Sequence, residues 1–329
     1  MIISKTPFRI SFFGGGTDYP AWFKEYGGQV LSTTIDKYCY LSVRHFPPFF
    51  PYKHRIVYSK TEEVNEIGEI LHPAVKAALQ FFKVEKGLSI HHDGDLPART
   101  GLGSSSSFTV GLLHALHALQ NQEISKEELA KEVVHMEQDI LKESVGSQDQ
   151  VAVTYGGFNK ITFSQNGEFR VESVQVSNEQ VKELESSLRL YFTGFSRTAS
   201  EIAKTQIENT KNRVQELTQM HQMVDEGIRI LKEDKGLEEF GRLLNETWQI
   251  KKGLSDKITT PEIDAMYEKA KKAGAFGGKL LGAGGGGFLL LLIPQDKQES
   301  VRQALQDFLE VSFHFENNGS QIIYKNHKA

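Results

Sequence analysis

The feature that most constrains the fold of this chain is a glycine- and serine-rich turn at residues 97–107. It reads Pro-Ala-Arg-Thr-Gly-Leu-Gly-Ser-Ser-Ser-Ser, and an apolar pattern of helical period follows from Phe108 to Leu119. The serines therefore stand at a helix start, where backbone N–H groups lack partners and the helix dipole is positive. Because glycine lets the backbone approach a ligand, the turn suits an anion, usually phosphate. Taken alone, the turn fits a serine-rich helix cap better, and only the further motifs favour a phosphate site.

Composition is typical of a globular protein with about two domains. The 329 residues are 39% hydrophobic and 24% charged, so a sizeable core can form. The net charge is −4, without the clustered Lys and Arg that a nucleic-acid surface needs, and no nucleic-acid partner is expected. The single cysteine, Cys39, excludes an intrachain disulfide and fits a reducing compartment.

The apolar runs of the chain predict neither export nor membrane insertion. Lys5, Pro7 and Arg9 interrupt the run that a signal peptide needs, and the apolar run 288–293 is too short to span a bilayer. We therefore expect a cytoplasmic protein without a membrane partner. No segment suggests a macromolecular partner, and a homodimer is left open.

A second glycine-rich turn, Gly-Gly-Gly-Thr-Asp at residues 14–18, follows a predicted buried strand at 2–13. Three glycines remove side chains where a strand ends, which leaves room for a ligand beside the backbone. Arg9 and Asp18 are the charged groups nearest to this gap. A glycine turn with Asp18 as a helix cap explains the same residues equally well.

One carboxylate interrupts the pattern of a helix that begins near residue 126 with a capping box. On a helical projection Glu137 falls inside the apolar arc, between Val133 and Leu141. A buried unpaired carboxylate is costly, so Glu137 must be protonated, ion-paired or bound to a metal. A structural pair with Arg or Lys is the alternative to a metal site.

The remaining pattern predicts alternating strands and helices. Asp149 is expected in a loop at 146–150, before a strand at 151–155. We place a domain boundary near residue 180, which gives domains at 1–180 and 181–329. Further strands are expected at 30–35, 38–43 and 188–192, and further helices at 75–82, 199–232, 237–252 and 261–273.

A third glycine cluster, at residues 277–287, precedes the apolar strand that begins at Phe288. Gly282, Gly284 and Gly287 satisfy G-x-G-x-x-G, but the dinucleotide fingerprint needs a strand before the glycines and a helix after them. Here the order is reversed, and no Walker-type P-loop occurs. Four consecutive glycines at the start of a strand instead predict a backbone that passes close to a ligand or another loop.

In this order the three motifs, at 7–19, 97–107 and 279–288, resemble those of the GHMP kinase superfamily, which includes galactokinase, homoserine kinase and mevalonate kinase. The resemblance covers essentially the whole chain. It implies an α+β, two-domain fold: an N-terminal α/β domain like domain 2 of ribosomal protein S5, and a ferredoxin-like C-terminal domain. It also implies ATP and Mg²⁺ as cofactors, with ATP and the acceptor meeting in a cleft between the domains.

The resemblance also implies a role for each matching residue. Asp149 resembles the catalytic aspartate that orients or deprotonates the acceptor hydroxyl, with Arg9 beside it to keep it ionised. Ser105 and Glu137 resemble the Mg²⁺ ligands, and residues 279–288 would pack against the phosphate loop. The residues expected to wrap the ATP phosphates are Pro97, Gly101, Leu102, Gly103, Ser104, Ser105, Ser106 and Ser107. Those expected to contact the acceptor are Gly15, Gly16, Thr17, Asp18, Lys37, Arg99, Arg197, Gly284 and Gly285.

Within the superfamily, residues 14–18, 31–38 and 192–197 look most like the D-glycero-D-manno-heptose 7-phosphate kinases, which phosphorylate the anomeric hydroxyl. Galactokinase has Glu-His where this chain has two glycines at 15–16, so the sugar contacts of that pair are missing. An acceptor that already carries a phosphate requires a cationic pocket. The candidates for that pocket are Arg99, Arg197, Lys204 and Lys37.

Two other functions remain open from the sequence. One is a GHMP kinase for another sugar, such as a fucose-like acceptor. The other is a nucleotide-binding regulator of the same fold that has lost turnover. Loss of the catalytic aspartate would mark such a regulator, and Asp149 is present.

Overall fold

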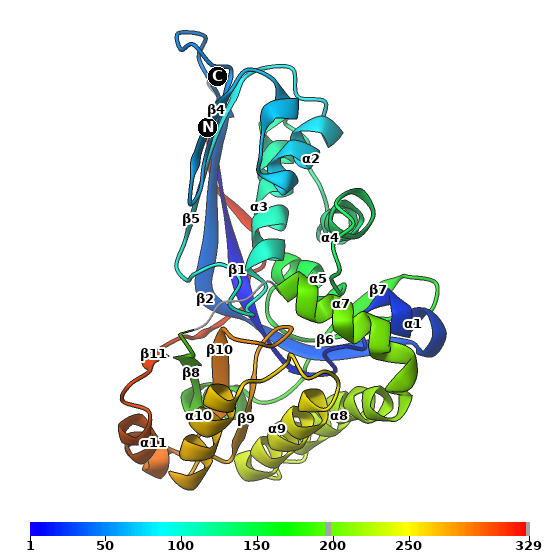
Figure 1. Cartoon of the computed structure of the whole chain (residues 1–329), viewed down its shortest axis with the longest axis vertical. Coiled ribbons are helices and arrows are strands. Elements are labelled where there is room, and N and C mark those ends of the chain that lie inside the picture. The colour runs from blue at the N-terminus through cyan, green and yellow to red at the C-terminus, as the bar shows by residue number, and fades with distance from the viewer. Residues whose placement is uncertain (195–198, 327–329) are drawn as a thin grey trace.

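The structure is a computed structural model that describes residues 1–194 and 199–326. Within these residues two sheets form, one of nine strands and one of four. In Figure 1 the larger sheet stands upright with helices on one face, and the smaller sheet lies below it with helices of its own. These two layered units confirm the predicted α+β class.

Two long antiparallel strands, β1 (Ile2–Phe13) and β2 (Gly28–His45), form the centre of the larger sheet. Two strands with Asp36 and Lys37 between them were predicted here, and a single strand is observed. Pro7 pairs with Tyr38 while Phe8 pairs with Ile35, so Asp36 and Lys37 form a bulge within β2 rather than a turn. The other strands of this sheet are β3 (His54–Val57), β4 (Thr61–Val64), β5 (Leu88–Gly94), β6 (Phe158–Phe163), β7 (Phe169–Ser173), β12 (Phe315–Glu316) and β13 (Gln321–Lys325).

Helix α3 (Ser104–Leu119) packs directly on β1 and β2. Gly111 makes this close approach possible, because a Cβ there would lie 3.0 Å from Thr6 Oγ1, and Ser4 Oγ donates to the Gly111 carbonyl at 2.9 Å. The packing places the serine-rich start of α3 beside the C-terminal half of β1. The other helical segments of this unit are α1 (Pro20–Tyr26), η1 (Ile67–Glu69), α2 (Pro73–Phe81), α4 (Lys126–His135), η2 (Met136–Ile140), α5 (Gln148–Tyr155) and α6 (Asn178–Ser187).

The prediction of a strand at 151–155 was wrong, because this segment is the second part of α5. Its sequence is rich in strand-forming residues, but Val151–Thr154 are buried on every side. The helix packs against α3, α4 and β1, and this burial outweighs the intrinsic preference of the residues. Asp149 therefore lies in the first turn of a helix rather than in a loop.

The smaller sheet has the order β11-β8-β10-β9 and is antiparallel throughout. Its elements follow the β-α-β-β-α-β succession of a ferredoxin-like unit. One predicted helix, 199–232, is two helices separated by the 3₁₀ turn η3 (Thr210–Asn212). The strands are β8 (Leu188–Phe192), β9 (Gly277–Leu280), β10 (Phe288–Leu292) and β11 (Leu309–Val311). The helices are α7 (Ala199–Asn209), α8 (Val214–Lys232), α9 (Leu237–Lys252), α10 (Pro261–Lys272) and α11 (Gln298–Ala304), with the 3₁₀ turn η4 (Gln295–Lys297) before α11.

The end of the chain returns to the larger sheet. Strand β13 pairs with β1, β12 pairs with β2, and the Asn326 N–H donates to the Met1 carbonyl at 3.0 Å. Figure 1 shows the two termini side by side. The strands after β11 therefore belong to the larger sheet of the first unit. A boundary near residue 180 remains our proposal for where the second unit begins.

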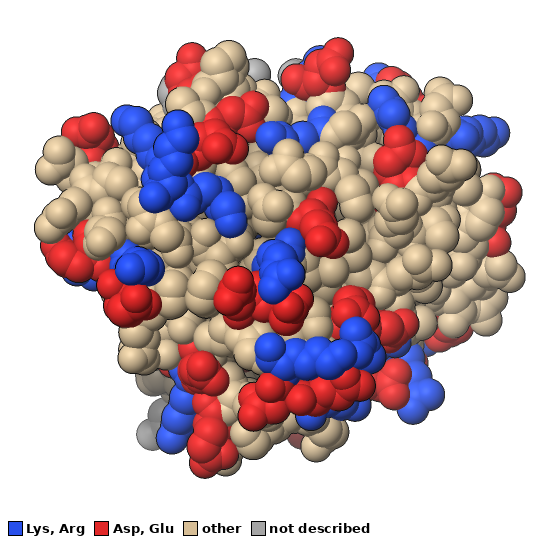
Figure 2. Space-filling model, turned by 90° about the horizontal axis from the view of Figure 1, so that it is seen from below, with Lys and Arg blue, Asp and Glu red and all other residues tan. Residues whose placement is uncertain are grey.

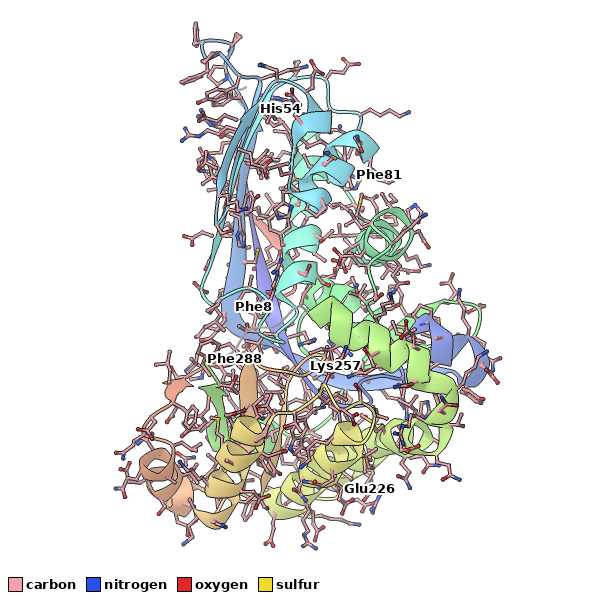
Figure 3. All side chains as sticks on the ribbon, in the orientation of Figure 1. Phe8, His54, Phe81, Glu226, Lys257 and Phe288 are labelled. Carbon is pink, nitrogen blue, oxygen red and sulfur yellow. The ribbon has the colours of Figure 1, made fainter. Side chains whose placement is uncertain are left out.

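The two sheets meet near the functional motifs. In Figure 3, Phe8 of β1 and Phe288 of β10 lie near this junction, whereas His54 and Glu226 lie toward opposite ends of the molecule. On the face in Figure 2, acidic and basic side chains are interspersed. Among the described residues, no helix has the length and apolar character needed to cross a membrane.

Candidate active site

The predicted phosphate loop forms the turn before α3. Gly101 and Gly103 have positive φ angles of 84° and 76°, and Gly103 is the N-cap residue. Ser107 is buried and donates to the Pro7 carbonyl at 2.8 Å, which ties the start of the helix to β1. Ser105, in contrast, is exposed, so its hydroxyl and the first turn of α3 are accessible to a ligand.

Arg9 and Asp149, which the sequence predicted as a catalytic pair, form a bidentate ion pair. Arg9 Nε and Nη2 each donate to a carboxylate oxygen of Asp149 at 2.8 Å. The Arg9 side chain is 4% exposed and that of Asp149 is 26% exposed, so the carboxylate faces open space while the guanidinium is buried. Arg9 Nη1 also donates to the Gly101 carbonyl at 2.7 Å. One arginine thus fixes both the carboxylate and the phosphate loop.

Asp18 lies next to this pair and is 2% exposed. One of its carboxylate oxygens accepts from the Gly16 N–H at 3.0 Å, and the other from the Gln148 N–H at 3.4 Å. Burial, and to a smaller extent the charge of Asp149, raise the pKa of Asp18 to about 6. A Cβ at Gly146 would overlap the Asp18 carboxylate, so a glycine is needed there. These contacts hold the predicted acceptor loop against the start of α5.

The other predicted acceptor residues of this loop differ in what they can offer a ligand. The Thr17 side chain is fully buried and donates to the carbonyls of Gly14 and Gln29 at 2.8 Å each, so it stabilises the loop. Gly15 leaves space, because a Cβ there would have its nearest neighbour 3.9 Å away. At Gly16 a Cβ would lie 3.0 Å from a methyl group of Leu217. The open position is therefore Gly15.

Glu137 lies in the π-helical segment η2 and is 1% exposed. One carboxylate oxygen accepts from Ser106 Oγ at 3.0 Å and from the Gln150 amide. Oε1 has no hydrogen-bond partner among the described residues, although the Thr109 hydroxyl lies near the carboxylate and favours its charged form. Burial raises the pKa of Glu137 to about 7. Its partners are a hydroxyl and an amide, and not the Arg or Lys of the alternative interpretation. Single π-helical turns of this kind are frequent at functional sites.

The unpartnered oxygen of Glu137 provides a test of whether this position suits Mg²⁺. Carboxylate and hydroxyl oxygens are ligands that Mg²⁺ accepts, and it is commonly bound by one or two carboxylates together with substrate phosphates. No cluster of three or more His, Cys, Asp or Glu side chains that could hold a metal occurs among the described residues. The site therefore fits a cation that arrives with phosphates. The serine that contacts Glu137 is Ser106, while the predicted ligand Ser105 points to the exposed side.

The third glycine motif packs against the phosphate loop, as the resemblance implied. A Cβ at Gly101 would overlap the Leu281 carbonyl, and a Cβ at Gly282 would overlap Gly101 itself. The Phe288 N–H donates to the Thr100 carbonyl at 3.2 Å. The two backbones are thus in direct contact, which only glycine allows.

Gly284 and Gly285, which were predicted to contact the acceptor, lie against the loop that follows α9. The Gly285 N–H donates to the Ile258 carbonyl at 2.8 Å, and a Cβ at Gly284 would lie 2.8 Å from the same backbone. Their close approach is therefore to protein backbone, and a contact with the acceptor stays a prediction.

Gly101→Ala is expected to destabilise the protein by more than about 2 kcal/mol and to lower kcat/KM at least about tenfold. The new Cβ would force apart the two glycine-rich backbones that shape the phosphate loop. Gly167→Ala is the matched control, because Gly167 has a similar φ of 89° but no atom within 4 Å of the added Cβ. Urea unfolding and steady-state kinetics of both variants provide the comparison, and equal effects would contradict the proposed contact.

The cationic residues predicted to bind an acceptor phosphate differ in their surroundings. Arg99 is exposed in the phosphate loop, and Lys204 is exposed on α7. Lys37 pairs with the neighbouring Asp36 at 3.0 Å. Arg197 lies outside the described residues. Their grouping around one phosphate stays a prediction.

Sequence reasoning missed two buried lysines of this site. Lys251 received no attention, and Lys279 was included only as part of the third motif. A signal was present for Lys251, because it continues the apolar face of α9 that includes Leu244 and Trp248. The same reasoning that identified Glu137 would have identified it.

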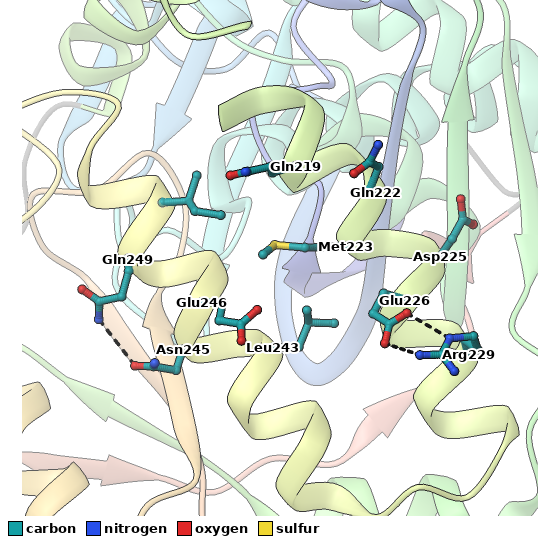
Figure 4. A pocket seen from close by; sticks show the side chains of 11 residues that line it. Gln219, Gln222, Met223, Asp225, Glu226, Arg229, Leu243, Asn245, Glu246 and Gln249 are labelled. Atoms are coloured by element: carbon teal, nitrogen blue, oxygen red, sulfur yellow. Dashed lines mark hydrogen bonds and ion pairs between the residues drawn. The ribbon is translucent and has the colours of Figure 1, made fainter. Parts of the chain in front are cut away.

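A separate groove of about 740 Å³ lies between α8 and α9 (Figure 4). Amide and charged side chains line much of it, and Arg229 pairs with Glu226 at one side. It shares no residue with the described part of the predicted site. We therefore place the active site by the contacts of the motif residues and not by the size of this groove.

Comparison with known proteins identifies the family. The family models described as GHMP kinases N terminal domain and GHMP kinases C terminal match residues 69–157 and 229–311. A D-glycero-alpha-D-manno-heptose 7-phosphate kinase of Campylobacter jejuni is 31% identical over 323 residues, which cover 93% of each chain. The chain belongs to the GHMP kinase family. It is therefore a phosphotransferase with an alcohol group as acceptor, and GHMP kinases use ATP as phosphate donor.

Solved structures agree with this GHMP kinase fold. A crystal structure of a D-glycero-D-manno-heptose 1-phosphate kinase from Bacteroides thetaiotaomicron is 25% identical, with a TM-score of 0.79 over 99% of this chain and 100% of its own. The galactokinase of Lactococcus lactis, solved with galactose, shares the fold at 20% identity, with a TM-score of 0.73 over 98% and 95% of the two chains.

Proposed function

We propose that this GHMP kinase transfers the γ-phosphate of ATP to the anomeric C1 hydroxyl of D-glycero-D-manno-heptose 7-phosphate. The product would be the 1,7-bisphosphate used to make nucleotide-activated heptose. The observation that carries the proposal is the half-buried Asp149 carboxylate, held by Arg9 beside the phosphate loop. A Cβ at Gly103 would lie 3.4 Å from Asp149 Oδ2, so the carboxylate lies directly against the loop.

The relatives support a heptose phosphate as acceptor, but their names place the phosphate differently. One is called a heptose 7-phosphate kinase and the other a heptose 1-phosphate kinase. Transfer to C1 is thus part of our proposal. Galactokinase has a Glu-His pair at the positions of Gly15 and Gly16. Because this chain lacks those two side chains, the space at Gly15, beside the buried Asp18, suits a bulkier acceptor.

In this proposal each residue has one task in phosphoryl transfer, which depends on positioning and on charge neutralisation. Asp149 accepts a hydrogen bond from the acceptor hydroxyl and receives its proton as the bond from the hydroxyl oxygen to the γ-phosphorus forms and the bond from that phosphorus to the leaving ADP oxygen breaks. Arg9 holds the Asp149 carboxylate in one orientation. The N–H groups at the start of α3 stabilise charge on the phosphates. When bound, Mg²⁺ would be held by Glu137 and a serine hydroxyl and would neutralise phosphate charge.

The acceptor's own phosphate requires a cationic contact in the same pocket. We propose four candidates for this contact, which are Arg99, Arg197, Lys204 and Lys37. Arg99 is exposed within the phosphate loop itself, so its guanidinium is accessible to a second ligand beside the nucleotide. A planar guanidinium also matches phosphate geometry with two hydrogen bonds.

A coupled ADP-release assay with Mg²⁺-ATP and a panel of acceptors tests this function. The panel contains D-glycero-D-manno-heptose 7-phosphate, sedoheptulose 7-phosphate, mannose, galactose, fucose and mevalonate. We expect strong turnover on the heptose phosphate alone, with phosphorus NMR showing a new anomeric phosphate. Turnover only on an unphosphorylated sugar would keep the kinase but remove the cationic pocket. ATP binding without turnover on any acceptor would favour a regulator.

A further inference from the structure

Two lysines are buried behind the phosphate loop, and their ammonium groups contact backbone carbonyls. Lys251 of α9 is 7% exposed, and its Nζ donates to the carbonyl of Leu280 at 3.0 Å and to that of Gly282. Lys279 of β9 is 3% exposed, and its Nζ donates to the Phe12 carbonyl at 2.8 Å. Within the described part of the chain, neither lysine forms an ion pair with a carboxylate.

These carbonyls belong to the segments that build the active site. Gly282 is the residue whose backbone touches Gly101 of the phosphate loop. Phe12 is the next-to-last residue of β1, shortly before the glycine turn that leads to Asp18. Lys251 and Lys279 therefore hold together the third motif, the phosphate loop and the acceptor loop. They are positioning residues, since they contact backbone and not reacting atoms.

The charges around the two lysines leave positive charge in excess. Arg9 and each lysine repel the other cations, and Asp18 is the acidic group that faces both lysines. Asp149 is already paired with Arg9. Of the other elements against α9, helix α8 directs Asp225 toward Lys160 and Gln29 instead.

Burial is the main cause of the altered titration of both lysines, and the neighbouring cations add to it. The pKa of Lys251 is lowered to about 7, and that of Lys279 well below its usual range. Without a ligand, the Lys251 amine is therefore largely neutral at mildly alkaline pH, and burial also disfavours the charged form of Lys279. A polyphosphate anion at the adjacent loop would favour their charged forms.

We propose that Lys251 and Lys279 form a buried pair that takes up one proton from solvent, mainly at Lys251, when a nucleotide polyphosphate occupies the loop at 101–107. The proposal rests on the proposed function, because it requires a nucleotide at that loop. Proton uptake and nucleotide affinity are then linked. The nucleotide binds more tightly where the lysines can be protonated, and its affinity falls as the pH rises.

Titration calorimetry with Mg²⁺-ADP, which binds without turnover, tests the pair. At about pH 8, in buffers of different ionisation enthalpy, wild-type protein is expected to take up about one proton per ADP. The ADP dissociation constant is expected to rise up to about tenfold between about pH 8 and pH 9. Lys251→Met should abolish most of the uptake and flatten this pH dependence.

Lys252→Met is the matched control, because Lys252 is the next residue of α9 but pairs with Asp264 at 3.2 Å near the surface. On binding ADP, the Lys252→Met variant should take up as many protons as the wild-type protein does. Wild-type binding of ADP with no proton exchange, or full uptake by Lys251→Met, overturns the buried pair while the kinase proposal stands. No binding of ADP by the wild type overturns both. The absence of proton uptake by the wild type overturns the pair even if Lys251→Met fails to fold.

Discussion

Asp149→Asn is expected to lower kcat by about 10²–10⁴-fold, the usual contribution of a positioned general base. Asparagine keeps the shape of the side chain but cannot accept the proton of the acceptor hydroxyl. Arg9 can still donate to its amide oxygen, so the loop contacts of Arg9 are expected to survive. ADP-release kinetics with the heptose phosphate provide the measurement, and calorimetry with ADP shows whether the nucleotide site is intact.

Asp296→Asn serves as the control for Asp149→Asn, because Asp296 lies on the surface and, among the described residues, forms an ion pair with its neighbour Lys297 alone. Its kcat should equal that of the wild type. If Asp149→Asn folds, binds ADP and retains kcat within a few-fold of the wild type, Asp149 has no role in proton transfer. In that case another group must orient the acceptor hydroxyl.

Glu137→Gln is expected to remove most activity and yet to stabilise the unliganded protein. The loss of activity follows because the substitution removes the charge of the carboxylate that we propose as a Mg²⁺ ligand, one oxygen of which has no hydrogen-bond partner among the described residues. We expect the Mg²⁺ concentration for half-maximal activity to rise about 10–100-fold. Kinetics over a range of Mg²⁺ concentrations test this part. An unchanged Mg²⁺ requirement would show that Glu137 is not a ligand.

The stability effect of Glu137→Gln depends on pH in a defined direction. The folded-state pKa of Glu137, about 7, lies above its ordinary value of 4.5, so the folded protein binds more protons than the unfolded chain between these values. This glutamate therefore costs stability as the pH rises from 4.5 to 7. Above pH 7 the cost is about 3 kcal/mol, and Glu137→Gln should be more stable than the wild type by up to this amount.

Urea unfolding in the presence of a chelator, at about pH 5 and pH 8, measures this difference. The gain in stability should be largest at the higher pH and should narrow at the lower one. Glu246→Gln, at an exposed glutamate of α9, should change neither stability nor Mg²⁺ dependence. A Glu137→Gln variant that is less stable than the wild type at pH 8 would mean that the carboxylate is well solvated or paired in solution.

Both buried ionisable groups, Glu137 and Lys251, are costly to the unliganded fold in this view. Natural proteins tolerate such costs at functional sites, where a ligand later supplies the missing charge. The two groups are complementary, because a bound cation would compensate the charge of the buried carboxylate, and a bound anion would compensate the charge of the buried amines. A nucleotide that binds together with Mg²⁺ would satisfy both at once.

Local chemistry explains which predictions were confirmed. The capping box at Ser125 stabilises a helix start through contacts between residues that are three positions apart, and α4 begins directly after Ser125. The apolar arc around Glu137 correctly predicted its burial. The third glycine cluster predicted a close approach to a ligand or to another loop, and Gly282 lies against Gly101 of the phosphate loop. In each case the deciding interactions lie within a few residues, or follow from the lack of a side chain.

Long-range packing explains the predictions that were wrong. Residues 151–155 have strand-forming side chains, but the space between α3, α4 and β1 accommodates a helix. Residues 36–37 resemble a turn, but the partner strand β1 continues past them, and the two extra residues form a bulge. Neither outcome can be read from the segment alone, because the neighbour that decides it is distant in the chain.

The sequence by itself determined the family, the phosphate loop and the presence of a buried carboxylate, because these follow from motif order and from helical period. Only the tertiary structure decided how the groups meet. It gave the Arg9–Asp149 pair, which the resemblance had implied, its bidentate geometry across 140 positions. It also brought Ser106 rather than Ser105 to Glu137, and buried Lys251 among carbonyls. The physical reason is that burial and charge neutralisation depend on distances in space, which arise only when β1, α5, α9 and the glycine-rich loops pack together.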